Sequence, residues 1–326
     1  MSQDLLNLLA AAPSADAFGA AWSLLASATH TPSVDVQREI DSRLEAWPDD
    51  ACLAPEGWWR YVAHAPVHLL VRVVCLGGPF MTAAPLEAYQ ALPLVAPHLR
   101  TLTVTRFEDG QAADCVAALG QARFEKLRRL NMAYAPESLP WLQAASLPAL
   151  EHLEFEADLA PRDWARLLQA PWAARLETMA LAGDSLVGHL GSLFRCTRLK
   201  SLRLSAWGDD GRAALGLDDI LAIAQCSQLT ALDIEGTCLG ADTAQAIIDS
   251  RLPERLERLN IEVEAQDVSR LDDDLKLAFW EAGWVHPQPR QAIESVYRRF
   301  FQARKHKLPA DAAVQTLRHP PPPAFG

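Results

Sequence analysis

The chain has 326 residues, of which 50% are hydrophobic and 22% charged, a composition typical of one large or two ordinary globular domains with a sizeable core. Thirty basic residues against 41 acidic ones leave a net charge of −11, so nucleic acid would meet a general repulsion of its phosphates. These values argue against a nucleic-acid partner and against a wholly disordered chain.

The N-terminal region predicts two helices, over residues 4–25 and 34–47, with turn-forming residues between them. The chain begins Met1-Ser2-Gln3-Asp4, with an acid where a secretory signal requires basic residues, so we expect a cytoplasmic protein.

The apolar run over residues 67–75 contains Arg72 and is much shorter than the ~20 residues that cross a bilayer, so no membrane span is expected. The alternation over residues 67–74 is that of a degenerate first strand. Its inward residues would be Leu69, Val71 and Val73, and its outward residues His68, Leu70 and Arg72, an interpretation that the residues leave open.

From residue 99 onward one pattern recurs, in which an apolar residue is followed three and five positions later by two more. Successive copies begin 23 to 30 residues apart, a spacing that indicates a repeat architecture. The seven copies are Leu99-Leu102-Val104, Leu127-Leu130-Met132, Leu150-Leu153-Phe155, Leu176-Met179-Leu181, Leu199-Leu202-Leu204, Leu229-Leu232-Ile234 and Leu256-Leu259-Ile261.

Positions 4 and 6 of each copy face the same side of a short strand, and one strand cannot bury that side alone. We therefore expect the copies to stack as a parallel sheet, at about 4.8 Å per strand, with the return segments packed behind it. Residues 163–169 and 217–224 have the spacing of amphipathic helices, so the predicted fold class is α/β.

Over about residues 99–262 the pattern resembles the leucine-rich repeat family, and is similar to its ribonuclease-inhibitor-like and irregular bacterial members. The resemblance implies a solenoid with a parallel sheet on its concave face, helices on its convex face and helical caps. The family usually places Asn, Cys or Thr eight positions after the first leucine to hydrogen-bond the turn. Uneven turns are expected here, because only three such positions hold a suitable residue, namely Asp158, Asp184 and Thr237.

Two further helices are predicted over residues 271–284 and 291–306, before a polyproline-like tail at 320–323. The helix over 291–306 is amphipathic and basic, so it either caps the last repeat or binds a membrane surface or an acidic partner. The predicted division is a helical N-terminal cap over 1–65, a repeat solenoid over 66–270 and a helical C-terminal cap with a Pro-rich tail over 271–326.

Positions 3, 5 and 7 of each copy project from the concave face. The central copy presents only small side chains there, between charged neighbours, and such a floor inside a polar rim suits the docking of a partner's side chain. The alternative is a solvated face on which charges pair across strands, as Arg203 and Asp233 would. The candidate partner-binding residues are Arg129, His152, Glu154, Glu156, Thr178, Ala180, Arg203, Asp233 and Glu235.

His152, Glu154 and Glu156 are residue types that bind metals. Alternate residues of a strand stand about 6.6 Å apart, however, so these side chains spread along a line and do not converge on one ion. Thr178 is the single neighbouring nucleophile, and no strained nucleophile elbow is evident. The sequence predicts no metal, no cofactor and no catalytic residue.

Three aromatic residues, Phe107, Tyr134 and Trp207, fall at or near strand exits. They form a candidate partner-binding rim, the alternative being ordinary turn packing. Trp141 and Trp164 occupy the same position of successive repeats and are expected in the core behind the sheet.

The six cysteines include no CxxC pair, which argues against a zinc or redox site. Cys196 and Cys226 share a position that is apolar in the other repeats, so we expect neighbouring buried thiols. A disulfide between them is not expected in a reducing compartment.

These features predict a non-catalytic scaffold that binds a partner protein on the concave face, the function that the family resemblance most often implies. The alternative is the substrate-recognition module of an enzyme such as a ubiquitin-ligase-type effector. The bacterial repeat ligases carry a Cys-x-Asp nucleophile motif, and none of the six cysteines here has Asp two positions later. The residues do not specify the partner or the oligomeric state.

Overall fold

The computed structural model describes residues 2–77, 83–108, 110–133, 135–183, 186, 188–206, 213–214, 216–235, 237–238, 246–247, 250 and 252–261. Within them, eight strands form one parallel sheet in the order β1-β2-β3-β4-β5-β6-β8-β10. The strands are β1 (Val73–Leu76), β2 (Thr101–Val104), β3 (Arg129–Ala133), β4 (His152–Glu156), β5 (Thr178–Gly183), β6 (Ser201–Ala206), β8 (Ala231–Glu235) and β10 (Arg258–Ile261). A separate parallel pair is β7 (Ala213–Ala214) with β9 (Thr237–Cys238).

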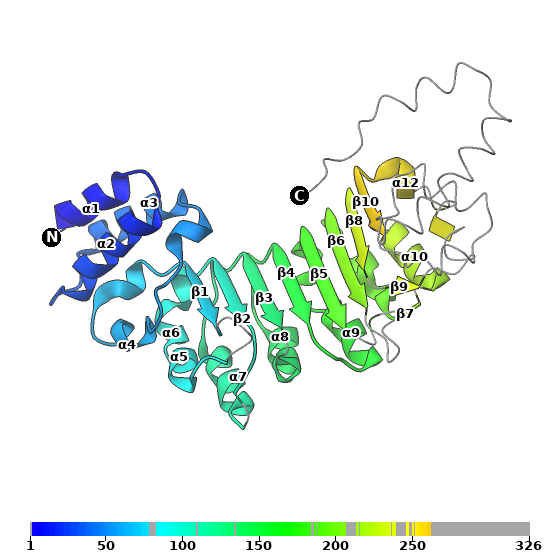
Figure 1. Cartoon of the computed structure of the whole chain (residues 1–326), viewed down its shortest axis with the longest axis horizontal. Coiled ribbons are helices and arrows are strands. Elements are labelled where there is room, and N and C mark those ends of the chain that lie inside the picture. Colours follow the sequence, from blue (N-terminus) through cyan, green and yellow to red (C-terminus); the bar gives the residue numbers. More distant parts are fainter. Residues whose placement is uncertain are drawn as a thin grey trace, which may run out of the picture.

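Helical segments connect consecutive strands, as parallel pairing requires. Figure 1 shows the strands side by side in chain order, with α5, α7, α8 and α9 on one face of the sheet. The helices after β1 are α5 (Leu86–Gln90), α6 (Leu92–Val95), α7 (Ala112–Gln121), α8 (Leu139–Ala144), α9 (Pro161–Leu167), α10 (Leu217–Ala224) and α12 (Leu252–Arg255). Short 3₁₀ helices complete these connections, η4 (Ala96–His98), η5 (Pro136–Ser138), η6 (Ala173–Arg175) and η7 (Leu190–Arg195). The predicted α/β architecture with a parallel sheet is confirmed.

The core lies between the sheet and these helices. Positions 4 and 6 of the repeated triplets supply its sheet side, and from β2 to β8 none of these side chains is more than 2% exposed. The backbone repeats as well, because the carbonyl before each strand accepts N–H groups from two consecutive residues of the next repeat. The carbonyl of Arg72, for example, accepts from Arg100 and Thr101, at 2.8 and 3.1 Å. This ladder sets the register from one repeat to the next.

The N-terminal region contains three helices, α1 (Ser2–Ala10), α2 (Ala15–Ala26) and α3 (Val34–Glu45). The single helix expected over residues 4–25 is therefore wrong. It is interrupted before Ser14, because Pro13 cannot continue the α1 hydrogen bonds and the Ser14 hydroxyl caps α2 by accepting from Ala17 N at 3.1 Å. The connection from α3 to β1 contains η1 (Asp49–Cys52), α4 (Trp59–Val62) and η2 (Pro66–Leu69).

The first strand starts later than the alternation over 67–74 suggested. In β1 the inward side chains are Val74 and Leu76, whereas residues 66–69 form the 3₁₀ helix η2. Leu70 and Arg72, expected to face outward, are buried. The alternation fails because the N-terminal helices pack against this segment, so both of its sides lie in the interior.

One turn of the repeat is held by a residue outside the predicted set. Asp219, in the first turn of α10, is buried and accepts from the backbone N–H groups of Gly188, Leu190 and Gly216 at 2.7, 3.3 and 3.2 Å. Asp158 is exposed. Asp184 and the side chain of Thr237 lie outside the described residues, as do the helices predicted over 271–284 and 291–306 and the tail at 320–323.

Candidate interaction surface

The sheet face opposite the helices carries positions 3, 5 and 7 of each repeat, and from β3 to β8 we call it the open face. Because the strands are parallel and in register, equivalent positions form rows that run across them. The position-3 row is Arg129, His152, Thr178, Ser201 and Ala231; the position-5 row is Asn131, Glu154, Ala180, Arg203 and Asp233; the position-7 row is Ala133, Glu156, Ala182, Ser205 and Glu235. All nine candidate face residues thus belong to one surface.

Small side chains occupy the middle of the open face. Ala180 is half-buried on β5, with Glu154 directly beside it on β4 and Arg203 beside it on β6. Glu154 and Arg203 are exposed, so the alanine lies lower than its charged neighbours. The low floor expected from the sequence is therefore present.

The carboxylates of β4 differ in their partners. Glu154 Oε2 accepts a hydrogen bond from Asn131 Nδ2 on β3, at 2.8 Å. Glu156 is half-buried between Ala133 and Ala182, and makes no hydrogen bond or ion pair with any residue that the structure describes. An acid in that setting can accept a hydrogen-bond donor from outside the chain.

His152 is unsuited to carrying a positive charge. Burial lowers its pKa, and the positive charge of Arg129, directly opposite on β3, lowers it further, against a smaller opposing influence of nearby carboxylates. Thr178 is its register partner on β5. Among the described residues no group of three or more His, Cys, Asp or Glu side chains is placed to hold a metal ion.

We begin the open face at β3 because the N-terminal region covers the first residue of β2, the strand before it. Thr101, the position-3 residue of β2, is only 8% exposed, and its hydroxyl donates a hydrogen bond to the carboxylate of Asp49 in η1. Arg100 Nη2 lies 3.2 Å from the same carboxylate. Thr101 is therefore unavailable to a partner, although its position in the repeat placed it on the concave face.

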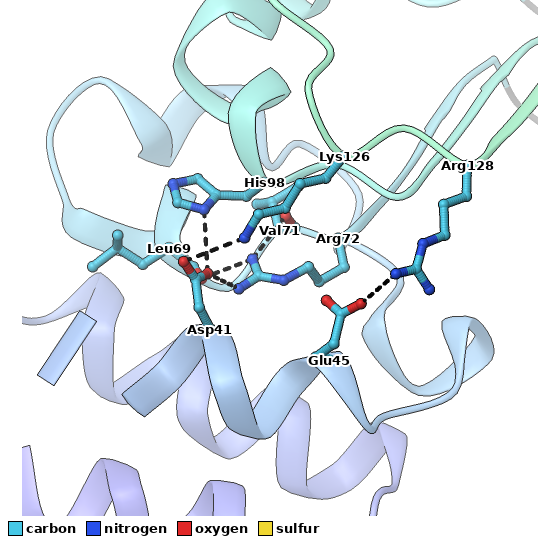
Figure 2. Close-up of polar contacts among 8 residues, drawn as sticks. All are labelled: Asp41, Glu45, Leu69, Val71, Arg72, His98, Lys126 and Arg128. Carbon is cyan, nitrogen blue, oxygen red and sulfur yellow. Dashed lines mark hydrogen bonds and ion pairs between the residues drawn. The ribbon is translucent and has the colours of Figure 1, made fainter. Parts of the chain in front are cut away.

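Sequence reasoning missed the ionic contact that attaches the N-terminal helices to the sheet. Figure 2 shows Asp41 and Glu45, one turn apart on α3, meeting basic residues of the repeats. Arg72 Nη2 lies 2.5 Å from Asp41 Oδ1, and Arg128 Nη2 lies 2.8 Å from Glu45 Oε1. Asp41 and Glu45 stand four residues apart, a spacing that could have indicated one charged face of the helix predicted over 34–47.

Asp41 is the centre of this contact. Besides Arg72, His98 Nδ1 lies 3.3 Å from its Oδ1 and Lys126 Nζ lies 3.5 Å from its Oδ2 (Figure 2). Burial raises the pKa of Asp41, but the close contact with His98 and the positive charges of Arg72 and Lys126 outweigh it and lower the pKa to about 2. Arg72 is itself buried and also donates to the carbonyls of Leu69 and Val71.

The expected aromatic rim is wrong at Phe107. That side chain is only 5% exposed and packs on Tyr89 of α5, with ring centroids 5.6 Å apart. Tyr134 and Trp207 lie outside the described residues, so their part of the rim stays a prediction.

Behind the sheet, Trp164 is buried as expected and Trp141 is half-buried. Each packs edge-on against a phenylalanine, Trp164 on Phe155 and Trp141 on Phe124, at 6.0 and 5.9 Å between ring centroids. The aromatic pairs thus belong to the core.

Cys196 and Cys226 are free and buried, as predicted. Burial raises the pKa of Cys196 to about 12 and that of Cys226 to about 11, so neither is a reactive thiolate near neutral pH. Every helix among the described residues is too short or too polar to cross a bilayer.

A scan against protein-family models and a search of curated proteins both return no match for this chain.

Proposed function

We propose that the chain is a non-catalytic scaffold of the leucine-rich repeat type, which binds a partner protein on the open face in the cytoplasm. The observation that carries this proposal is the set of three polar rows, aligned across five consecutive strands and backed by a continuous core. A rigid sheet with aligned side chains presents an extended surface to a partner at little cost in ordering.

The repeat type is supported by the spacing of 23 to 30 residues, by one strand in each copy and by strands that pair in chain order. On this reading residues 66–270 form the solenoid, whose open face is concave, and residues 1–65 form its N-terminal cap. The ion pairs of Asp41 and Glu45 attach that cap. Residues 271–326, the predicted C-terminal cap, lie outside the described residues.

The chemistry of the open face supports a binding role over a catalytic one. A histidine that acts as a general base must become positively charged during the reaction, and Arg129 opposes that charge on His152. Its register partner Thr178 offers an unactivated hydroxyl. The ubiquitin-ligase-type alternative would need a catalytic cysteine, and the Cys-x-Asp motif of those enzymes is missing from the sequence.

The test is capture of partners from the native cell by the full chain and by variants of the open face. Ala180→Arg fills the low floor, and Glu154→Arg reverses a charge beside it. The matched controls are Ala117→Arg on α7 and Glu137→Arg in η5, both exposed and away from the open face.

A stoichiometric protein partner should be retained by the two controls and reduced at least tenfold by Ala180→Arg and Glu154→Arg. Equal capture by all four variants would exclude the open face as the binding surface. Turnover of a substrate by the purified chain would replace the scaffold with an enzyme.

A further inference from the structure

Charges on the open face are sorted by row. The position-3 row contains the positive charge of Arg129 and no acid, and Arg258 of β10 continues it beside Ala231. Among the position-7 side chains that the structure describes, Glu156 is the charged one, and none is basic. The position-5 row between them is mixed. The face is therefore polarised along the strands, with basic residues toward their N-terminal ends and acidic residues toward their C-terminal ends.

Two of the acidic groups close to the position-3 row, Glu177 and Asp49, are already paired, whereas Glu151 makes no ion pair with a described residue. Glu177, which precedes β5, accepts from Arg198 Nη2 at 2.6 Å and from Lys200 Nζ at 2.8 Å. Asp49 is engaged by Arg100 and Thr101. Within the row from β3 to β8, Arg129, which is exposed, is the one side chain that carries a permanent charge, and that charge is positive.

The dimensions of the face match one secondary structure in particular. Four residues separate the position-3 row from the position-7 row, about 13 Å along a strand. An α-helix with its side chains is about 10–12 Å across, so it fits between the two charged rows and above the half-buried Ala180. The four intervals from β3 to β8 span about 19 Å, the length of about 13 helical residues.

We propose that the occupant of the open face is an α-helix of the partner protein, which crosses the strands and lies along the rows. Its basic side chains meet the position-7 row, where Glu156 has no partner among the described residues, and its acidic side chains meet Arg129. This inference rests on the proposed function and adds the chemistry of the partner. Opposite charges on two sides of one helix would also set the direction in which it binds.

The test uses a phage-displayed library of single 18-residue helices, whose positions are drawn from Ala, Leu, Lys, Arg and Glu. The full chain serves as the target at low ionic strength. Wild type should enrich helices that carry Lys or Arg on one side and Glu on the opposite side.

Arg129→Glu makes both outer rows acidic, so the wild-type clones should bind it at least tenfold more weakly, and selection on it should yield helices basic on both sides. Glu156→Lys should instead yield helices acidic on both sides. Each variant must keep the thermal midpoint of wild type. Ala117→Arg, on the face away from the rows, should leave the clones unchanged.

Two failures are distinguishable. Clones that bind Ala180→Arg as tightly as wild type bind elsewhere on the chain, which counts against the proposed function itself. Clones that require Ala180 but show no charge polarity, or that ignore Arg129→Glu, overturn the helix proposal and leave the open face as a binding surface. Absence of any enriched helix overturns the helix proposal as well.

Discussion

Replacing Asp41 by asparagine removes the negative charge that pairs α3 with basic residues of the repeats, and it leaves the volume of the side chain nearly unchanged. Asp41 contacts Arg72, His98 and Lys126, which belong to three successive connections of the chain (Figure 2). Arg72 is only 2% exposed in its side chain, so the loss of its carboxylate partner leaves a buried guanidinium with carbonyl acceptors alone.

The magnitude follows from the pKa of Asp41. A fall from 3.8 to about 2 corresponds to about 2.5 kcal/mol of stabilisation by the ionised form. The side chain is 31% exposed, and screening by water reduces this to about 1.5–2 kcal/mol. This value already includes the interaction with buried Arg72, so we expect Asp41→Asn to lower the free energy of unfolding at pH 7 by about 1.5–2 kcal/mol.

The pH dependence has a definite sign. Because the folded-state pKa is depressed, the stabilisation is complete well above pH 4 and is lost as the pH falls toward about 2. Urea unfolding at pH 7 and pH 3 should show the difference between wild type and Asp41→Asn shrink to about half. The control is Asp35→Asn, also on α3, whose pair with Arg38 is exposed and which should change stability by at most about 0.5 kcal/mol at either pH.

A difference below about 0.5 kcal/mol at pH 7, or one of equal size at both pH values, would refute the assigned role of Asp41.

Three further outcomes are expected. Gly183→Ala places a Cβ 2.3 Å from the carbonyl oxygen of Ala157, so thermal unfolding should show a loss of about 3 kcal/mol, whereas Gly19→Ala on α2, with nothing within 4 Å, should stabilise by about 0.5–1 kcal/mol. A much smaller loss of stability at position 183 would mean that the backbone at Ala157 shifts to make room for the added Cβ. Asp219→Ala leaves three backbone N–H groups without their acceptor, and a urea titration should register a loss of about 3 kcal/mol; a neutral result would show that other acceptors replace it. In the native protein a maleimide should label Cys75, which is exposed. Mass spectrometry should find label on the buried thiols, Cys52, Cys115, Cys196 and Cys226, only after unfolding, and label on these in the native protein would contradict their burial.

Much of the sheet followed from local pattern. The last two residues of each triplet, such as Leu153 and Phe155, form an apolar pair that must be buried on one side of a strand, and the regular spacing of the triplets requires the strands to stack. The intervening residues, Glu154 among them, consequently share the opposite face. The prediction was weaker at the ends of the repeats, where β1 begins at Val73 and the alternation before it fails.

The failures have a common physical origin. Phe107 was expected on a partner-binding rim, but it turns inward because Tyr89, from the preceding helical connection, offers it an aromatic partner. Asp219 holds a turn through N–H groups about 30 residues away in the chain. Neither contact has a periodic signature, since each depends on one residue meeting another from a different repeat.

The sequence by itself determined the parallel stacking and the identity of the residues in the three rows, because burial of a periodic apolar pattern permits one arrangement of the strands. Only the tertiary structure decided where the open face begins. Asp49 covers Thr101, and Asp41 pairs with Arg72, across separations of 52 and 31 residues. Charge pairing over such distances is set by how the N-terminal helices dock, and no local pattern of residues specifies it.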